Sequence, residues 1–252
     1  MVKFADNFYF GSATSATQCE GAHTPADKGK DIWDVWFEQE PDRFHGGIGP
    51  DTTSTFYEHY KTDIPLLKAT GQNSFRTSIS WSRLFPEGRG KVNEKAAAYY
   101  RDLFEELRKN GIEPFVNLFH FDMPAALQEI GGWENRQVVD DYANYAKTCF
   151  ELYGDIVKRW FTFNEPIVHV ECGYLTNYHY PCKVDPKAAV QVAYHTALAC
   201  ASAVKTYHEL NQGGKIGIVL NLTPAYPRSS NPADVKAAEI AELFANKSFL
   251  DP

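Results

Sequence analysis

Asn164 and Glu165 place an amide beside a carboxylate at the end of the apolar stretch FTFNEP. The aromatic and β-branched residues before this pair favour a strand, and Pro166 cannot continue it because proline lacks the backbone N–H that pairs in a sheet. The pair is therefore predicted at the carboxyl end of a strand. Aromatic surroundings would disfavour the charged form of the glutamate and make it a proton donor, whereas a strand-end carboxylate that faces water would have no special chemistry.

Four other apolar stretches of the sequence also end in polar side chains. They are NFYFGSATSATQCEGA, QNSFRTSISWSR, IEPFVNLFHFDMP and GGKIGIVLNLTP. Their polar residues, in chain order, are Gln18 and Glu20, Arg76, His120 and Asp122, and Asn221. Arg76 could pair with a core acid, His120 could be a core histidine and Asn221 could cap a loop. Five strands that each end in such residues nevertheless favour one shared site.

Helical periodicity separates the predicted strands. Apolar residues recur at the i, i+3, i+4 and i+7 positions of amphipathic helices, Gly111 and Gly154 supply C-terminal stops, and Asp185 with Pro186 forms an N-cap and first turn. The predicted helices span residues 55–71, 95–111, 142–154 and 186–210. Strands that alternate with helices imply a parallel sheet.

This regular repeat predicts an α/β fold. The sequence contains no GxGxxG turn and no GxxxxGK[ST] loop. Their absence favours the eight-fold (β/α)8 TIM barrel, whose active site lies at the carboxyl ends of the strands, over a doubly wound nucleotide-binding sheet. A Rossmann-type dehydrogenase is the weaker alternative. Residues 1–252 supply about the first five β/α units of such a barrel.

The composition argues against several kinds of partner. The chain has 252 residues, 44% of them hydrophobic, and a formal net charge of −7 without a basic run. It therefore offers no electrostatic surface for nucleic acid or for an anionic membrane. No apolar run approaches the roughly 20 residues of a membrane span, and the first residues lack the pattern of a signal peptide. We expect a cytoplasmic protein.

Cysteine and histidine spacing predicts neither disulfides nor a metal site. The five cysteines form no CxxC pair, and the eight histidines include no HExxH motif. We expect the cysteines to be reduced and mostly buried, and we expect no metal and no cofactor.

The predicted rim suits a polyhydroxylated substrate. Sugar hydroxyls need both donors and acceptors, which Gln18, His120 and Asn164 supply. Trp33 and Trp81 could stack on a sugar, but we expect both to pack in the core and assign neither to the site.

The sequence resembles glycoside hydrolase family 1, the β-glucosidase and 6-phospho-β-glycosidase family, over essentially the whole chain. The resemblance rests on FYFGSATSATQCEGA, FRTSISWSRLFP, NLFHFDMPAALQEIGGW, FTFNEP and GIVLNL. It implies that Glu165 is the general acid/base and that Asn164 contacts the sugar 2-hydroxyl. It also implies that Arg76 holds the nucleophile ionised.

The resemblance extends to the sugar subsite. Gln18, His120 and Asn221 match further sugar contacts of the family. Thr17 is a departure, because the family usually has an aromatic residue, Asn or His at that position, but the departure casts little doubt on Gln18.

The second catalytic carboxylate of a retaining glycosidase is missing from the sequence. Such enzymes place two carboxylates about 5–5.5 Å apart. The family nucleophile lies in a TENG-like segment, which does not occur here, and the WENR segment at residues 133–136 only imitates it. Eight strands at this spacing would need roughly 400 residues. We therefore expect residues 1–252 to be the N-terminal portion of a single TIM-barrel glycosidase domain and to be inactive alone.

The substrate class follows only from the resemblance. HFDMP and GYLTNYHYP are similar to the branch that hydrolyses 6-phospho-β-glucosides, such as phosphorylated disaccharides or aryl glucosides. An unphosphorylated β-glucosidase or β-galactosidase and a non-catalytic sugar-binding fragment are the alternatives. The expected partner is thus a small carbohydrate.

Overall fold

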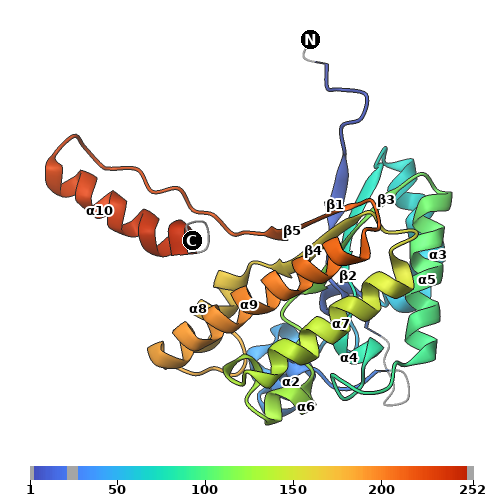
Figure 1. The fold of residues 1–252 in the computed structure, drawn as a ribbon, viewed down its shortest axis with the longest axis horizontal. Helices are drawn as coiled ribbons and strands as arrows, with labels where there is room; N and C mark the ends of the chain where they lie inside the picture. Colours follow the sequence, from blue (N-terminus) through green and yellow to red (C-terminus); the bar gives the residue numbers. More distant parts are fainter. Residues whose placement is uncertain (1–2, 22–27, 249–252) are drawn as a thin grey trace.

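Five parallel strands form one sheet, in the order in which they occur along the chain (Figure 1). The computed structural model describes residues 3–21 and 28–248. The strands are β1 (Gly11–Ala13), β2 (Ser74–Ser78), β3 (Glu113–Phe119), β4 (Arg159–Asn164) and β5 (Lys215–Val219). Each neighbouring pair is parallel, so the five predicted strands and their common direction are confirmed.

Helices connect these strands, as the sequence predicts. The α-helices are α1 (Ala16–Cys19), α2 (Ile32–Gln39), α3 (Phe56–Ala69), α4 (Trp81–Leu84), α5 (Glu94–Lys109), α6 (Ala125–Glu129), α7 (Gln137–Tyr153), α8 (Pro166–Tyr174), α9 (Pro186–Leu210) and α10 (Pro232–Glu242). Shorter helical turns are η1 (Pro41–Arg43), η2 (His45–Gly47), η3 (Gly132–Glu134) and η4 (Leu243–Lys247). The four predicted helices correspond to α3, α5, α7 and α9.

Local sequence sets the ends of the long helices. The carboxylate of Asp185 accepts hydrogen bonds from the backbone N–H groups of Lys187 at 3.0 Å and Ala188 at 3.1 Å, so Asp185 is the predicted N-cap of α9. Gly111 follows α5 with a left-handed φ of 70°. Gly154 is the C-cap of α7, but its φ of −67° is one that any residue adopts, so its conformation does not require glycine. An added Cβ would lie 1.8 Å from Oε1 of Gln212, the end of a flexible side chain.

The core lies between the sheet and the helices that cover its outer face. Trp81 is fully buried there, as predicted, and stacks on Tyr145 with ring centroids 5.0 Å apart. The Tyr145 hydroxyl lies 3.0 Å from the carbonyl oxygen of Ile79 and 2.9 Å from that of Leu118. Since Ile79 follows β2 and Leu118 belongs to β3, this buried hydroxyl ties the two strands together.

The cysteines are only partly as expected. All five are free thiols. Cys19 and Cys149 are buried, but Cys172, Cys182 and Cys200 are only half-buried. The prediction that most of them are buried is therefore wrong, because α8, α9 and the segment between them leave one side open to solvent.

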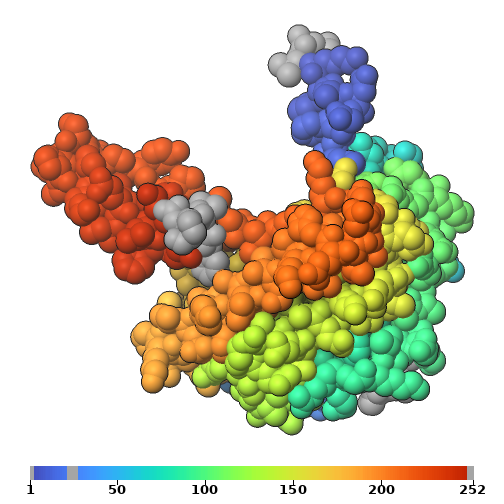
Figure 2. Space-filling view, in the orientation of Figure 1, coloured from blue at the N-terminus to red at the C-terminus, as the bar shows by residue number. Residues whose placement is uncertain are grey.

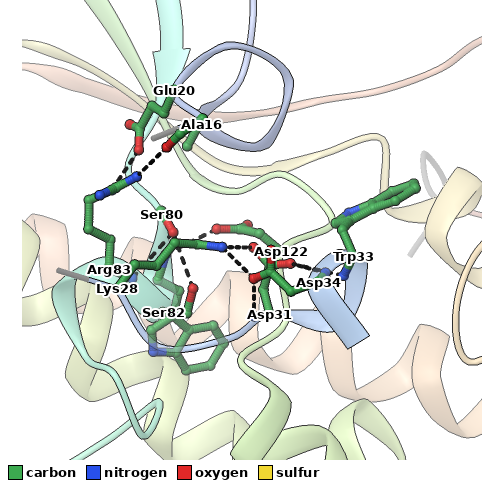
Figure 3. Close-up of polar contacts among 12 residues, drawn as sticks. Ala16, Glu20, Lys28, Asp31, Trp33, Asp34, Ser80, Ser82, Arg83 and Asp122 are labelled. Atoms are coloured by element: carbon green, nitrogen blue, oxygen red, sulfur yellow. Dashed lines mark hydrogen bonds and ion pairs between the residues drawn. The ribbon is translucent and has the colours of Figure 1, made fainter. Parts of the chain in front are cut away.

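A buried ionic network lies in the chain that follows β1 (Figure 3). Nε of Arg83 lies 2.8 Å from Oε2 of Glu20, and the two side chains are 1% and 4% exposed. The Tyr100 hydroxyl donates to Oε1 of Glu20 at 2.8 Å. Nearby, Nζ of Lys28 lies 2.8 Å from Asp31 and 2.6 Å from Asp34. These contacts anchor the chain after β1 to α4 and α5.

The sheet has two free edges within residues 3–21 and 28–248. β1 and β5 are its outer strands. The N-terminal segment and α10 stand away from the body of the molecule (Figure 2), and α10 buries none of its residues. Phe4, Phe8 and Phe10 are exposed and pack mainly on one another. No described helix is both long enough and apolar enough to cross a membrane.

The buried ion pair predicts a large loss of stability when one partner is removed. Arg83→Met should lower the free energy of unfolding by about 3–5 kcal/mol, because Glu20 would keep its buried charge without its partner. Chemical denaturation measures the change. Arg136→Met, which removes an exposed pair with Asp140, is the control and should cost less than about 1 kcal/mol. Equal losses in the two variants would contradict the role given to the buried pair.

Candidate active site

The chain turns sharply at the end of β4. Asn164 is the last residue of the strand, and Glu165 adopts a left-handed conformation with φ 46° and ψ 62°. The backbone N–H of Glu165 still donates to the carbonyl oxygen of Val219 at 2.8 Å, and Pro166 then begins α8. A non-glycine residue in this conformation costs on the order of 1–3 kcal/mol, and such strain is concentrated at functional sites.

Side chains from three strands meet around this turn. Nη1 of Arg76 donates to Oδ1 of Asn164 at 3.1 Å, and Nδ2 of Asn221 lies 3.4 Å from Oε1 of Glu165. Asn164 is buried, Arg76 and Glu165 are half-buried, and Asn221 is exposed. Burial lowers the pKa of Arg76, and the nearby charge of Glu165 acts in the opposite direction.

Arg76 and Asn221 differ in detail from their predicted positions. Arg76 is the third residue of β2 and reaches the rim through its long side chain, while Asn221 follows β5 by two residues. The structure nevertheless brings both beside Asn164 and Glu165, as expected from parallel strands.

Gln18 and His120 line a second part of the rim, a pocket of about 310 Å³. Gln18 belongs to the short helix α1 rather than to a strand, and it is exposed. His120 directly follows β3 and is 7% exposed. Burial, and then the charge of Arg76, lower the pKa of His120 to about 3. The imidazole is therefore neutral near pH 7, with one nitrogen that donates and one that accepts.

The core packing predicted for Trp33 is confirmed in part, because its side chain packs against the core but also faces the pocket. Trp33 is half-buried and lines the pocket with Phe121 and His179, two residues that sequence reasoning missed. Its Nε1–H donates to the carbonyl oxygen of Phe121 at 2.9 Å, and its ring lies 5.1 Å from the ring of His179. The available signal was that Phe121 lies within FHFDMP and His179 within GYLTNYHYP, but aromatic and imidazole side chains also occur in cores.

Two carboxylates predicted at strand ends lie behind the rim. Glu20 is buried against Arg83, and Asp122 is fully buried. Burial, together with the charge of Asp31, raises the pKa of Asp122 to about 7. Glu134 of the WENR segment pairs with Lys183 outside the site.

No carboxylate lines the pocket in the part of the chain that the structure describes, and Glu165 is not among its lining residues. Its lining residues are Ser15, Thr17, Gln18, Trp33, Phe44, Ile48, Gly49, Pro50, Thr53, His120, Phe121 and His179. None of these is an acid. Within residues 3–21 and 28–248, no group of three or more His, Cys, Asp or Glu residues is placed to hold a metal ion.

A buried histidine supports the wall of the pocket. His169 is 1% exposed, and neither ring nitrogen has a hydrogen-bond partner among the described residues. Its ring stacks on Phe121 and meets the edge of Phe119. Burial, and then His179, lower the pKa of His169 to about 3.

The fold is that of part of a (β/α)8 barrel, with polar side chains gathered at the carboxyl ends of its strands. The model of "Glycosyl hydrolase family 1" matches residues 1–252. The chain is 63% identical over 250 residues to the 6-phospho-beta-glucosidase GmuD of Bacillus subtilis, covering 99% of this chain and 54% of that protein. It is 40% identical over 251 residues to Beta-glucosidase A of Acetivibrio thermocellus, covering 100% of this chain and 56% of that protein.

Solved structures agree with the sequence comparison. The structure of a beta-glucosidase from Thermotoga maritima in complex with deoxynojirimycin aligns with a TM-score of 0.93 at 37% identity, over 97% of this chain and 55% of that one. The chain belongs to glycosyl hydrolase family 1, and the predicted TIM-barrel class with about five β/α units is confirmed. The chain spans a little over half the length of the relatives it matches.

The buried His169 predicts a pH-dependent stability. Its pKa is about 3 in the folded protein and 6.5 when exposed, so only the unfolded chain binds the proton between these values, and stability falls as the pH falls below about 6.5. His169→Phe should remove this effect, worth about 2 kcal/mol between pH 7 and pH 5. Urea unfolding at the two pH values measures it.

Other groups with shifted pKa values make a difference measurement necessary. His120 and His179, whose pKa values burial also lowers, contribute in the same direction as His169. Asp122 contributes in the opposite direction, since its raised pKa makes stability fall as the pH rises from about 4 to about 7. His59→Gln, at an exposed position, is the control. An unchanged pH slope in His169→Phe would show that the ring is not held neutral.

Proposed function

We propose that this chain carries the acid/base half of a retaining β-glycosidase that hydrolyses 6-phospho-β-glucosides. The observation that supports this most strongly is the position of Glu165. Its backbone is held in a left-handed turn at the end of β4, and its carboxylate lies among Asn164, Asn221 and Arg76. A strained backbone that directs a carboxylate into a polar rim is what a positioned proton donor requires.

The proposed mechanism assigns each side chain a separate task. The protonated carboxyl of Glu165 donates to the glycosidic oxygen as the bond to the anomeric carbon breaks, and the carboxylate then takes a proton from the attacking water. Asn164 binds the sugar 2-hydroxyl. Gln18, His120 and Asn221 bind the remaining hydroxyls, since an amide or a neutral imidazole can both donate and accept.

In the proposed mechanism, the nucleophile comes from barrel strands other than the five in residues 1–252. We propose that residues 1–252 are the N-terminal portion of a single TIM-barrel domain, and that the remaining strands carry the carboxylate that attacks the anomeric carbon. The two free edges of the sheet and the exposed apolar residues of α10 and η4, including Phe244 at 72%, support this proposal. Unpaired edges of this kind favour association or aggregation. The isolated chain should therefore be inactive.

The phosphorylated substrate is supported by similarity. The identity to the 6-phospho-beta-glucosidase GmuD is 63%, against 40% to Beta-glucosidase A. A phosphorylated sugar is retained inside the cell, which agrees with the cytoplasmic location expected from the sequence. The 40% identity and the TM-score of 0.93 to the Thermotoga maritima beta-glucosidase support an unphosphorylated β-glucosidase as the second candidate. A purely sugar-binding role is disfavoured, since binding alone needs no proton donor at residue 165.

A direct comparison of two substrates tests the proposed function. The full-length protein should turn over p-nitrophenyl β-glucoside 6-phosphate with a kcat/KM at least about 100-fold above that for the unphosphorylated glucoside, because a phosphate contact is a charge-assisted interaction worth several kcal/mol. The matching galactosides are the control. A preference for unphosphorylated glucoside would favour the second candidate, and turnover by residues 1–252 alone would contradict the proposed division of the barrel.

The role of Glu165 predicts a dependence on the leaving group. Glu165→Gln should slow hydrolysis of alkyl β-glycosides by about 10²–10⁴-fold but affect 2,4-dinitrophenyl glycosides much less in the glycosylation step, since a good leaving group needs no proton. Azide, a nucleophile that needs no general base, should partly restore turnover. Glu171→Gln, on the exposed side of α8, is the control. Equal losses on both substrates would exclude Glu165 as the acid.

A further inference from the structure

We propose that Asp122 is a positioning residue of the sugar site. Its buried carboxylate fixes the backbone that follows β3, and thereby sets the imidazole of His120 in the pocket. This inference rests on the proposed function, in which His120 contacts the sugar. Asp122 itself is fully buried and is not among the residues that line the pocket.

The carboxylate of Asp122 joins the carboxyl ends of two strands. Oδ1 accepts a hydrogen bond from the backbone N–H of His120 at 3.1 Å, and Oδ2 accepts one from the backbone N–H of Trp81 at 3.0 Å. Trp81 begins α4 just after β2, and His120 follows β3. Figure 3 shows Asp122 between Ser80, the N-cap of α4, and Asp31, the N-cap of α2. One side chain therefore holds the position of the rim at two adjacent strands.

The backbone next to Asp122 explains why such a clamp is needed. Neighbouring residues of a strand point to opposite faces, yet His120 and Phe121 both line the pocket. The left-handed conformation of Phe121, with φ 66°, makes this possible. This conformation is unfavourable for a residue with a Cβ, so the surrounding contacts must maintain it.

Hydrogen bonds hold the turn from its other side as well. The carbonyl oxygen of Phe121 accepts from Nε1 of Trp33 at 2.9 Å, and that of Met123 accepts from the backbone N–H of Ile32 at 3.0 Å. Both donors belong to α2. In the described part of the chain, Asp122 is the only side chain of the turn that binds the backbone N–H groups that follow β2 and β3. Its loss would therefore release the backbone at His120.

The two oxygens of Asp122 have a role that an amide cannot reproduce. Two backbone N–H groups point at its two oxygens, and a carboxylate can accept from both. The amide of an asparagine offers one oxygen, and its NH₂ group would face the second N–H. No Lys or Arg of the described residues forms an ion pair with Asp122, and its buried neighbour Asp31 is also acidic. A fold that needed only packing at this position would gain stability from a neutral residue.

The test uses four variants of the full-length protein. They are Asp122→Asn, His120→Ala, the double variant, and Tyr145→Phe as the control. Tyr145 is buried beside the same strand ends and bonds the carbonyl oxygens of Ile79 and Leu118, but it does not touch the His120 backbone. Tyr145→Phe should lower the unfolding temperature and leave kcat/KM within about threefold.

Kinetics distinguish positioning from a general loss of stability. Asp122→Asn should lower kcat/KM for p-nitrophenyl β-glucoside 6-phosphate by about 10- to 100-fold, because a displacement of about 1 Å at a substrate contact has effects of this size. In the His120→Ala background the same substitution should cost less than about threefold, because the residue through which Asp122 acts is already absent. A loss that is equally large in both backgrounds would overturn the proposal.

A measurement without substrate separates this proposal from the proposed function. The imidazole signals of His120 in a ¹⁵N-labelled protein are those that disappear in His120→Ala. They should shift in Asp122→Asn and stay in place in Tyr145→Phe. If the wild-type protein hydrolyses no β-glycoside, the proposed function fails, but these signals still decide the role of Asp122. If Asp122→Asn does not fold, Asp122→Ser, whose hydroxyl accepts from only one N–H, replaces it. Unshifted His120 signals in the folded variant would overturn the proposal.

Discussion

The parallel pairing of neighbouring strands is the constraint on which the whole site depends. Each long helix returns the chain to the end of the sheet where the next strand begins, so all five strands run in one direction. Their carboxyl ends therefore all lie at the opposite end of the sheet. Arg76 and Asn164 are 88 positions apart in the chain, yet they form a hydrogen bond. This bond connects β2 to β4 across the end of β3. The geometry of the rim is therefore a property of the sheet, and no single loop could supply it.

The sequence predicts the strands, the helices and the composition of the rim, and the physical reasons are clear. Helical periodicity in α5 and α9 persists over many residues, and Asp185 is a strong N-cap signal. Proline after Glu165 marks the end of β4 without reference to the rest of the fold. Residues at the carboxyl ends of the strands can then be assigned to one end of the sheet, because parallel strands all run in the same direction.

The details that the sequence does not reveal are set by tertiary contacts. Phe121 and Glu165 adopt left-handed conformations that their side chains disfavour, so local propensity predicts the opposite. Trp33 is a pocket residue only because its indole N–H reaches the carbonyl oxygen of Phe121, 88 positions away. Glu20 and Asp122 are carboxylates that the sequence places in the same predicted strand-end context as Glu165. They are excluded from the rim by Arg83 and by backbone N–H groups, which a sequence pattern cannot show.

The positive charge of Arg76 favours an anion in direct contact with the guanidinium. The guanidinium is half-buried, and its hydrogen bond goes to the neutral amide of Asn164. No acid among the described residues forms an ion pair with Arg76, while its charge lowers the pKa of His120. A partly desolvated cation is stabilised best by an anion in direct contact. In the proposed enzyme, the nucleophilic carboxylate would be this anion, and Arg76 would in turn keep that carboxylate ionised.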